Sequence, residues 1–302
     1  MATYQSYQQI GIKEDISELI SNISPTKVPF QSALGKEKVH NTLFQWQEDS
    51  LRAVAVNAAV EGADGSDVTV DPTVMRSGYT QILQETFKVS GTADAVATYG
   101  RARESAYQAA KSAAQVRRDL EHAMVGTQQT ADAGNSTTAR KLTSYQAQID
   151  ASVIKYTGAG PAALDETTLL SALQASYENG AEPDVVSVTP SNSLIVAAFA
   201  KASGRYRVIN DDRDTNKRVV NAVDLYVSPF GTVKVILNRF QHSGDTLVYD
   251  TSMWVQTTLR AWFRETLAKT GDAMKMQIVG EFGLKHKNKK ASALVVEGTT
   301  GL

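Results

Sequence analysis

The sequence predicts an α+β protein in which long segments project from a mixed body. Three observations predict this fold class. Apolar and polar residues alternate within residues 44–88, which is the period of a β-strand. An alanine-rich stripe with helical spacing runs through residues 100–127. Short apolar runs separated by turn residues follow residue 225, and they indicate a strand-rich C-terminal part.

The composition is that of a folded protein that tolerates self-association. The chain has 302 residues, a hydrophobic content of 42% and a formal net charge of −1. A charge near zero argues against a protein whose main task is to coat nucleic acid, and it gives copies little mutual repulsion. The absence of cysteine excludes disulfides, thiolate metal sites and thiol nucleophiles. The most apolar stretch, Leu194–Ala200, is far shorter than the roughly 20 residues that cross a membrane.

Residues 1–43 are expected to form an N-terminal arm. A short amphipathic helix is predicted over Glu14–Ile23, because its apolar residues share one face. It ends at Ser24, since a residue that precedes proline avoids helical backbone angles. A single short helix cannot bury its own apolar stripe, so it must lie on the body or on a neighbouring molecule. The stripe consists of Ile16, Leu19, Ile20 and Ile23.

Residues 44–88 are expected to form an extended β-hairpin with an acidic tip. The alternation begins around Trp46, continues through Val54 and Val56, and turns at the glycine-containing segment 61–66. Seven acidic and three basic side chains give residues 41–90 a net charge of −4. Such a hairpin is marginal in water, because two strands need a third surface.

Residues 100–127 are expected to form a long spine helix. About 27 residues at 1.5 Å each give a rod of roughly 40 Å. Five basic and three acidic side chains give this segment a net charge of +2. The stripe that predicts the helix consists of Tyr99, Ala102, Ala106, Ala109, Ala113, Val116, Leu120 and Ala123.

The remaining chain is expected to form mixed modules. Asp165 is predicted to cap a helix over Thr167–Tyr177, and a second helix follows from Ser191 to Ala200. A short buried strand lies between them at Val185–Val188. Further strands are expected at 225–227, 233–237, 246–249, 276–279, 282–285 and 293–296.

A search for catalytic or cofactor motifs gives nothing specific. The chain has no phosphate-binding loop, no dinucleotide-binding glycine motif, no zinc-protease motif and no nucleophile elbow. Asp119 and His122 have the spacing of a helical pair, which is more typical of a surface ion pair than of a metal site. The basic run over 285–290 is more typical of a solvated turn than of a nucleic-acid site. We therefore expect no enzyme activity, no cofactor and no metal.

Two segments, the arm and the acidic hairpin, cannot bury their own apolar surface. In these features and in several short motifs, the chain resembles the major capsid proteins of tailed bacteriophages, which have the Hong Kong 97-like fold. More narrowly, it resembles the SU-ten-like major head proteins. The resemblance covers nearly the whole chain and rests on the order of several short matches. These are residues 13–16, 23–26, 28–30, 46–51, 89–92, 104, 107–108, 118–121, 238–240, 253–254, 267–272 and 281.

The resemblance implies a division of the chain into named parts. The N-terminal arm is residues 1–43 and the extended loop is residues 44–88. The peripheral domain comprises residues 89–130 and 246–302 and contains the spine helix. The axial domain is residues 131–245.

The resemblance also implies a function and partners. Copies would form pentamers and hexamers that tile an icosahedral shell around the double-stranded DNA of a tailed phage. The protein would be a virion component assembled in the bacterial host cytoplasm, with a portal protein at one vertex and no membrane. Only about a dozen residues precede the first predicted helix, so a separate scaffolding protein is expected. Some relatives weld the shell through a lysine in the extended loop, but no lysine lies between Lys38 and Lys88, which predicts a non-covalent shell.

The opposite charges of the loop and the spine suggest how neighbouring copies meet. Acidic residues of one copy are expected to pair with arginines of the next, and the arm stripe of Ile16, Leu19 and Ile20 to pack on a neighbour. Exposed pairs contribute only about 0.2–1 kcal/mol each, so they would set register more than strength. The proposed pairs join Glu61, Asp64 and Asp67 to Arg101, Arg103, Arg117 and Arg118.

Three alternative functions are weighed against a capsid. An encapsulin-type nanocompartment shell would keep the fold but enclose enzymes instead of a genome. A cytosolic hydrolase of unrecognised type would need a nucleophile and a base, which four scattered histidines make hard to supply. Another virion part, such as a tail protein, is disfavoured by the long alanine-rich spine.

Overall fold

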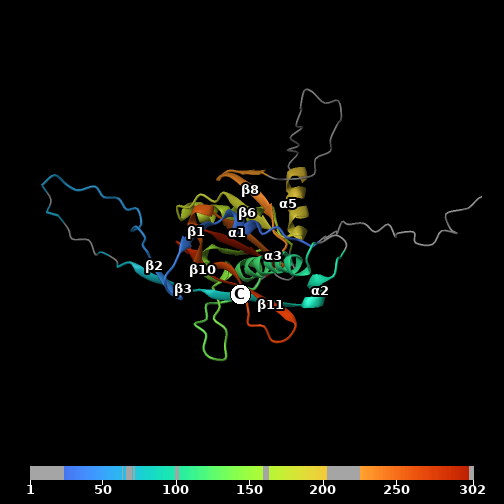
Figure 1. The fold of residues 1–302 in the computed structure, drawn as a ribbon. Coiled ribbons are helices and arrows are strands. Elements are labelled where there is room, and N and C mark those ends of the chain that lie inside the picture. The colour runs from blue at the N-terminus through green and yellow to red at the C-terminus, as the bar shows by residue number, and fades with distance from the viewer. Residues whose placement is uncertain are drawn as a thin grey trace, which may run out of the picture.

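The computed structural model describes residues 24–62, 64–65, 70, 72–98, 102–158, 163–202 and 225–298. Within these ranges the body contains two β-sheets and the long helix α3, and a two-stranded ribbon leaves it at one side (Figure 1). The amphipathic helix expected over Glu14–Ile23 lies outside the described residues. Short 3-10 helices in the described part of the chain span Gln146–Gln148, Ala151–Val153 and Thr251–Met253.

The first sheet has four strands in the order β1-β10-β11-β4. β1 runs parallel to β10, and the other neighbours are antiparallel. Helix α3 lies on one face of this sheet, where the Ser112 hydroxyl donates to Glu85 at 3.3 Å. The elements are β1 Gly35–Lys38, β4 Gln81–Ser90, β10 Trp254–Thr266, β11 Ala273–His286 and α3 Glu104–Val125.

The second sheet has six strands in the order β5-β12-β9-β6-β8-β7. It is mixed, because β5 pairs parallel with β12 and β6 pairs parallel with β8. Helix α4 packs against β12 and β5, and its start is capped as expected, since Asp165 accepts from the Thr167 N–H at 3.2 Å. The elements are β5 Ile154–Tyr156, α4 Glu166–Glu178, β6 Val185–Val188, α5 Pro190–Ala202, β7 Leu225–Ser228, β8 Gly231–Leu237, β9 Asp245–Tyr249 and β12 Ala293–Val296.

The expected extended hairpin is only partly a β-ribbon. β2 (Leu43–Glu48) pairs with β3 (Val74–Tyr79), and the outer residues 49–60 form no strand. Strand structure through Val54 and Val56 was a wrong expectation, because within one chain these residues have no third surface to lie on. The expected return strand is also divided, since β4 begins after Tyr79 and joins the four-stranded sheet.

The predicted spine helix is confirmed, with shorter limits. It begins at Glu104, because Arg103 has extended backbone angles of φ −144° and ψ 137°. Its first turn is capped from helix α2 (Gly91–Ala95), where the Asp94 carboxylate accepts from the Ser105 N–H at 2.9 Å. That hydrogen bond is the main reason that the pKa of Asp94 is lowered. At the other end the Gly126 N–H donates to the His122 carbonyl at 2.7 Å.

The buried stripe of α3 differs from the predicted one at two turns. Ser105 and Ser112 are buried where Ala106 and Ala113 were expected, so Ala106 is exposed and Ala113 half-buried. Burying serine is tolerated at position 112 because its hydroxyl finds Glu85 as an acceptor. Ala102 is exposed and precedes the helix, and Tyr99 lies outside the described residues. The other predicted positions, Ala109, Val116, Leu120 and Ala123, are buried as expected.

Gly280 does not separate two strands as expected. Residues 273–286 form the single strand β11, and Gly280 lies within it. A side chain at this position would collide with the rings of Trp262 and Phe282, so the glycine makes room for aromatic packing. Glycine inside a strand often marks such a close approach.

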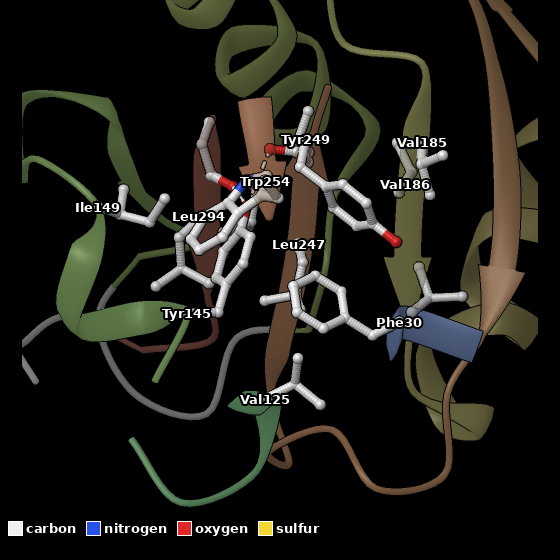
Figure 2. Packing of buried hydrophobic residues seen from close by; sticks show 14 of the residues in the cluster. Phe30, Val125, Tyr145, Ile149, Val185, Val186, Leu247, Tyr249, Trp254 and Leu294 are labelled. Carbon is white, nitrogen blue, oxygen red and sulfur yellow. Dashed lines mark hydrogen bonds between the residues drawn. The ribbon is translucent and has the colours of Figure 1, made fainter. Parts of the chain in front are cut away.

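The core joins both sheets through a group of aromatic side chains (Figure 2). The Tyr145 ring stacks on Trp254 with centroids 4.6 Å apart, and Phe30 meets Tyr249 edge to face at 5.3 Å. Trp254 is completely buried, and its indole N–H donates to Ser292 at 2.8 Å. Trp254 therefore belongs to the core.

Candidate assembly surfaces

The loop beyond β2 carries an exposed apolar surface. Residues 49–60 run outward from the body (Figure 1), and the side chains of Leu51, Val54 and Val56 are 96–102% exposed. Arg52 is the one charged residue within residues 51–60. Large apolar side chains exposed in a row mark a surface that contacts another molecule.

The acidic residues predicted for the interface are only partly within the described chain. Glu61 and Asp64 follow the apolar segment and are exposed, and Asp67 lies outside the described residues. Gly62 between them has a φ of +80°, which fits the turn expected here. Among the described residues, no ion pair involves Glu61 or Asp64.

The predicted arginines differ in their surroundings. Arg103, which directly precedes α3, and Arg117, which lies within α3, are both exposed, and Arg101 lies outside the described residues. Arg118 is half-buried, and its guanidinium lies over the Phe240 ring with the carbon 5.6 Å from the ring centroid. Among the described residues, no ion pair joins Arg103, Arg117 or Arg118 to Glu61 or Asp64.

The root of the arm is held by a buried carboxylate that the sequence did not indicate. Glu121 on α3 accepts from the backbone N–H groups of Phe30 and Gln31 at 2.9 and 3.0 Å. The Asn238 amide donates to the same carboxylate at 2.7 Å. Burial raises the pKa of Glu121 above its ordinary value. The short helix that it holds is α1, Pro29–Ala33.

A second buried carboxylate, Glu281, lies in β11 beneath the root of the ribbon. It accepts from Thr80 Oγ1 at 2.8 Å and pairs with Arg260 at 3.0 Å and with Arg140. Glu121 and Glu281 have no local signal in the sequence, because most of their partners lie tens to hundreds of positions away.

His122, His286 and three lysines of the basic run take part in structural contacts. His286 is buried on the Trp254 ring with centroids 3.9 Å apart, and burial lowers its pKa to about 3. His122 lies 3.3 Å from the Phe240 carbonyl, and among the described residues no ion pair joins it to Asp119. In the basic run, Lys285 pairs with Glu37, Lys287 bonds to the Ser252 carbonyl and Lys289 pairs with Asp150.

The described residues include no group of three or more His, Cys, Asp or Glu side chains that could hold a metal ion. Open hollows lie along α2 and α3 in the described part of the chain. One of about 470 Å³ lies between the alanine face of α3 and β10, with mostly apolar walls. Within the described ranges, none of the helices has the length and apolar character that a bilayer crossing requires.

Solved shell proteins share this architecture at low sequence identity. The capsid of cyanophage P-SCSP1u matches with a TM-score of 0.64 and 12% identity, over 99% of this chain and 96% of that chain. The SrpI encapsulin complex from Synechococcus elongatus matches with a TM-score of 0.63 and 9% identity, over 100% of both chains. The protein therefore has the Hong Kong 97-like fold, which capsids and encapsulins share.

Sequence similarity separates these two kinds of shell. Residues 1–300 match the SU10 major capsid protein family. The major capsid protein of Escherichia phage Phieco32 is 31% identical over 341 residues, which cover 97% of this chain and 96% of that protein. The chain belongs to the SU10 major capsid protein family. It is a structural component of the virion whose copies form the icosahedral head of a phage, and it is not an enzyme.

Proposed function

We propose that copies of this chain form pentamers and hexamers in which the N-terminal arm and the extended loop lie on neighbouring copies. The exposed apolar segment 51–60 is the observation that carries this proposal. Burying a valine or leucine side chain contributes about 1.5–3 kcal/mol. Leu51, Val54 and Val56 bury almost no surface within their own chain, so a neighbour would supply this free energy.

The two sheets support a division into a peripheral and an axial domain. The peripheral domain is assigned to residues 89–130 and 246–302, and the axial domain to residues 131–245. Sheet membership changes the assignment of three strands, because β4 belongs with the sheet that α3 covers, whereas β9 and β12 belong with the six-stranded sheet. The arm (residues 1–43) and the loop (residues 44–88) keep their assignments apart from β1 and most of β4, which pair within the body.

Charge pairs between copies are proposed to set the register of the loop. Glu61 and Asp64 would meet Arg103 and Arg117, all of which are exposed. Asp67, Arg101 and Arg118 belong to the same hypothesis. The Arg118 guanidinium is less available to a neighbouring copy, because it packs on the Phe240 ring. Pairs of this kind are weak singly, but many of them act together in a closed shell.

Other partners follow from the same assignment. Head-to-tail contacts close into rings only when the angle between copies is correct. We propose that a separate scaffolding protein helps to set this angle, and that a portal protein occupies one vertex. Contact with packaged double-stranded DNA is proposed to be non-specific, since three lysines of the basic run are engaged within the chain.

The test is assembly of the chain with and without its loop surface. The wild-type chain and a variant with residues 51–60 replaced by glycine and serine are expressed, then compared by gel filtration and negative-stain microscopy. We expect capsomers or shells from the wild type and monomers with an unchanged circular dichroism spectrum from the variant. Leu194→Ser, which removes a 72% exposed leucine elsewhere, serves as the control and should assemble normally. Normal shells from the loop variant would contradict the proposal.

A further inference from the structure

The direction in which the ribbon leaves the body depends on one connecting residue. Thr80 is the single residue between β3, which belongs to the ribbon, and β4, which belongs to the four-stranded sheet. It is completely buried. Its N–H donates to the Thr42 carbonyl at 3.0 Å, its hydroxyl donates to Glu281 at 2.8 Å, and its carbonyl accepts from Arg140 Nε at 2.5 Å. All of its polar groups are therefore engaged.

Glu281 connects this residue to three other segments. Its carboxylate is buried in β11 and also accepts from Arg140 and from Arg260 Nε, the latter at 3.0 Å. Arg260 lies where β10 is irregular, between shifts of its register with β11. Arg140 comes from the segment after α3. Removing the carboxylate would leave the buried Thr80 hydroxyl without this acceptor and the largely buried Arg140 guanidinium without its charge partner, which is destabilising locally.

Packing holds the ribbon in the same direction. The Phe44 ring of β2 lies against two glycines, Gly78 of β3 and Gly283 of β11. A Cβ at either glycine would stand 2.7 Å from a ring atom of Phe44, so the ring fits only because both side chains are absent. Phe44 in turn stacks with Trp46 at 5.9 Å, and the Lys285 ammonium lies 6.0 Å from the Trp46 ring centroid.

We propose that Glu281, acting through Thr80, Arg140 and Arg260, is the positioning residue that fixes the angle between the ribbon and the body. The ribbon root (residues 42–48 and 74–80) then keeps a fixed orientation relative to the body. The unpaired residues beyond it change conformation to fit the neighbouring copy. Twelve residues at about 3.3 Å each reach at most roughly 40 Å, so an error of about 10° at the root displaces the loop end by up to about 7 Å. The consequence for assembly rests on the proposed contact between loop and neighbour.

Glu281→Gln tests the inference, because it keeps the side-chain size and removes the charge. Hydrogen–deuterium exchange on the unassembled subunit should become at least about tenfold faster in the ribbon root and stay unchanged in α4. Closed shells should decrease and misshapen or open assemblies should increase. Glu265→Gln, an exposed position on β10, should change neither measurement.

A second pair of variants separates positioning from a general loss of stability. Leu173→Ala destabilises the buried core under the six-stranded sheet, and it should leave exchange in the ribbon root unchanged. Thr80→Val removes only the hydroxyl that donates to Glu281. If Glu281→Gln fails to fold, exchange in the ribbon root is measured on Thr80→Val instead. Unchanged root exchange in both Thr80→Val and any folded Glu281→Gln would overturn the inference. Because exchange is measured on unassembled subunits, this result is independent of whether the wild type forms shells.

Discussion

The Glu121 carboxylate lies 2.9 Å from the backbone nitrogen of Phe30, 91 positions earlier in the chain. Helix α1 has no side-chain cap of its own, and its first two available N–H groups point to Glu121. The spine helix thus supplies the cap for the root of the arm. The arm would leave the body from a fixed point, whatever contacts its earlier residues make.

Glu121→Ala should lower the free energy of unfolding by at least about 3 kcal/mol, because buried donors left without an acceptor cost about 1–3 kcal/mol each. Glu121→Gln should cost less, since it keeps an acceptor oxygen and removes a charge whose burial is unfavourable, as the raised pKa of Glu121 indicates. Urea denaturation of the unassembled subunit measures both. Glu178→Ala, an exposed change in α4, should stay within about 0.5 kcal/mol of the wild type. Equal losses at positions 121 and 178 would contradict the capping role.

His286 should make the subunit less stable as the pH falls. Its pKa is lowered by burial to about 3 in the folded chain, against about 6.5 when unfolded. Between these values the unfolded chain binds a proton that the folded chain does not, which removes about 1.4 kcal/mol per pH unit. From pH 7 to pH 5 the expected loss from this residue is therefore about 2 kcal/mol.

Denaturation of His286→Gln at both pH values isolates this contribution. Burial raises the pKa of Glu121 and of Asp245, so these groups contribute with the opposite sign, and they do so in both proteins. The variant should lose about 2 kcal/mol less than the wild type between pH 7 and pH 5. Parallel pH profiles for the two proteins would show that His286 is not held neutral.

The sequence predicted the helices whose signals lie within a few neighbouring residues. The periodicity of α3 and the Asp165 cap of α4 depend on residues within one or two turns, and both are found as expected. The burial of Glu121 and the network around Glu281 depend on partners up to 201 positions away, so no window of the sequence contains them. The extended loop failed in the opposite way. Its alternating valines predict a strand, but residues 49–60 form none, because no other described segment of the same chain pairs with them.

The shell should be held together without covalent links from the loop. No lysine lies between Lys38 and Lys88, so the loop has no amine that could form an isopeptide bond. Intact heads boiled in detergent should run on a gel as one band near 32.6 kDa. Heads treated first with an amine-reactive cross-linker provide the positive control, and a ladder of linked subunits from untreated heads would refute the prediction.

Reversing the charge of the spine should impair assembly without unfolding the subunit. Arg103→Glu combined with Arg117→Glu changes two exposed side chains, so the free energy of unfolding should shift by no more than about 1 kcal/mol. The loop of a neighbouring copy would then meet like charges, and head yield should fall, most clearly at low salt, where screening is weakest. Gel filtration and negative-stain particle counts at two ionic strengths measure the effect.

The matched control reverses the acidic partners as well. The double variant Glu61→Lys and Asp64→Lys should impair assembly as the arginine reversals do. The variant that carries all four changes should recover part of the head yield, because opposite charges face each other again. Arg118→Glu provides a contrast, since it removes the contact with Phe240 and should lower subunit stability as well as head yield. Normal head yield from the Arg103 and Arg117 double reversal would remove the proposed charge pairing, while the apolar contact of residues 51–60 would stand on its own test.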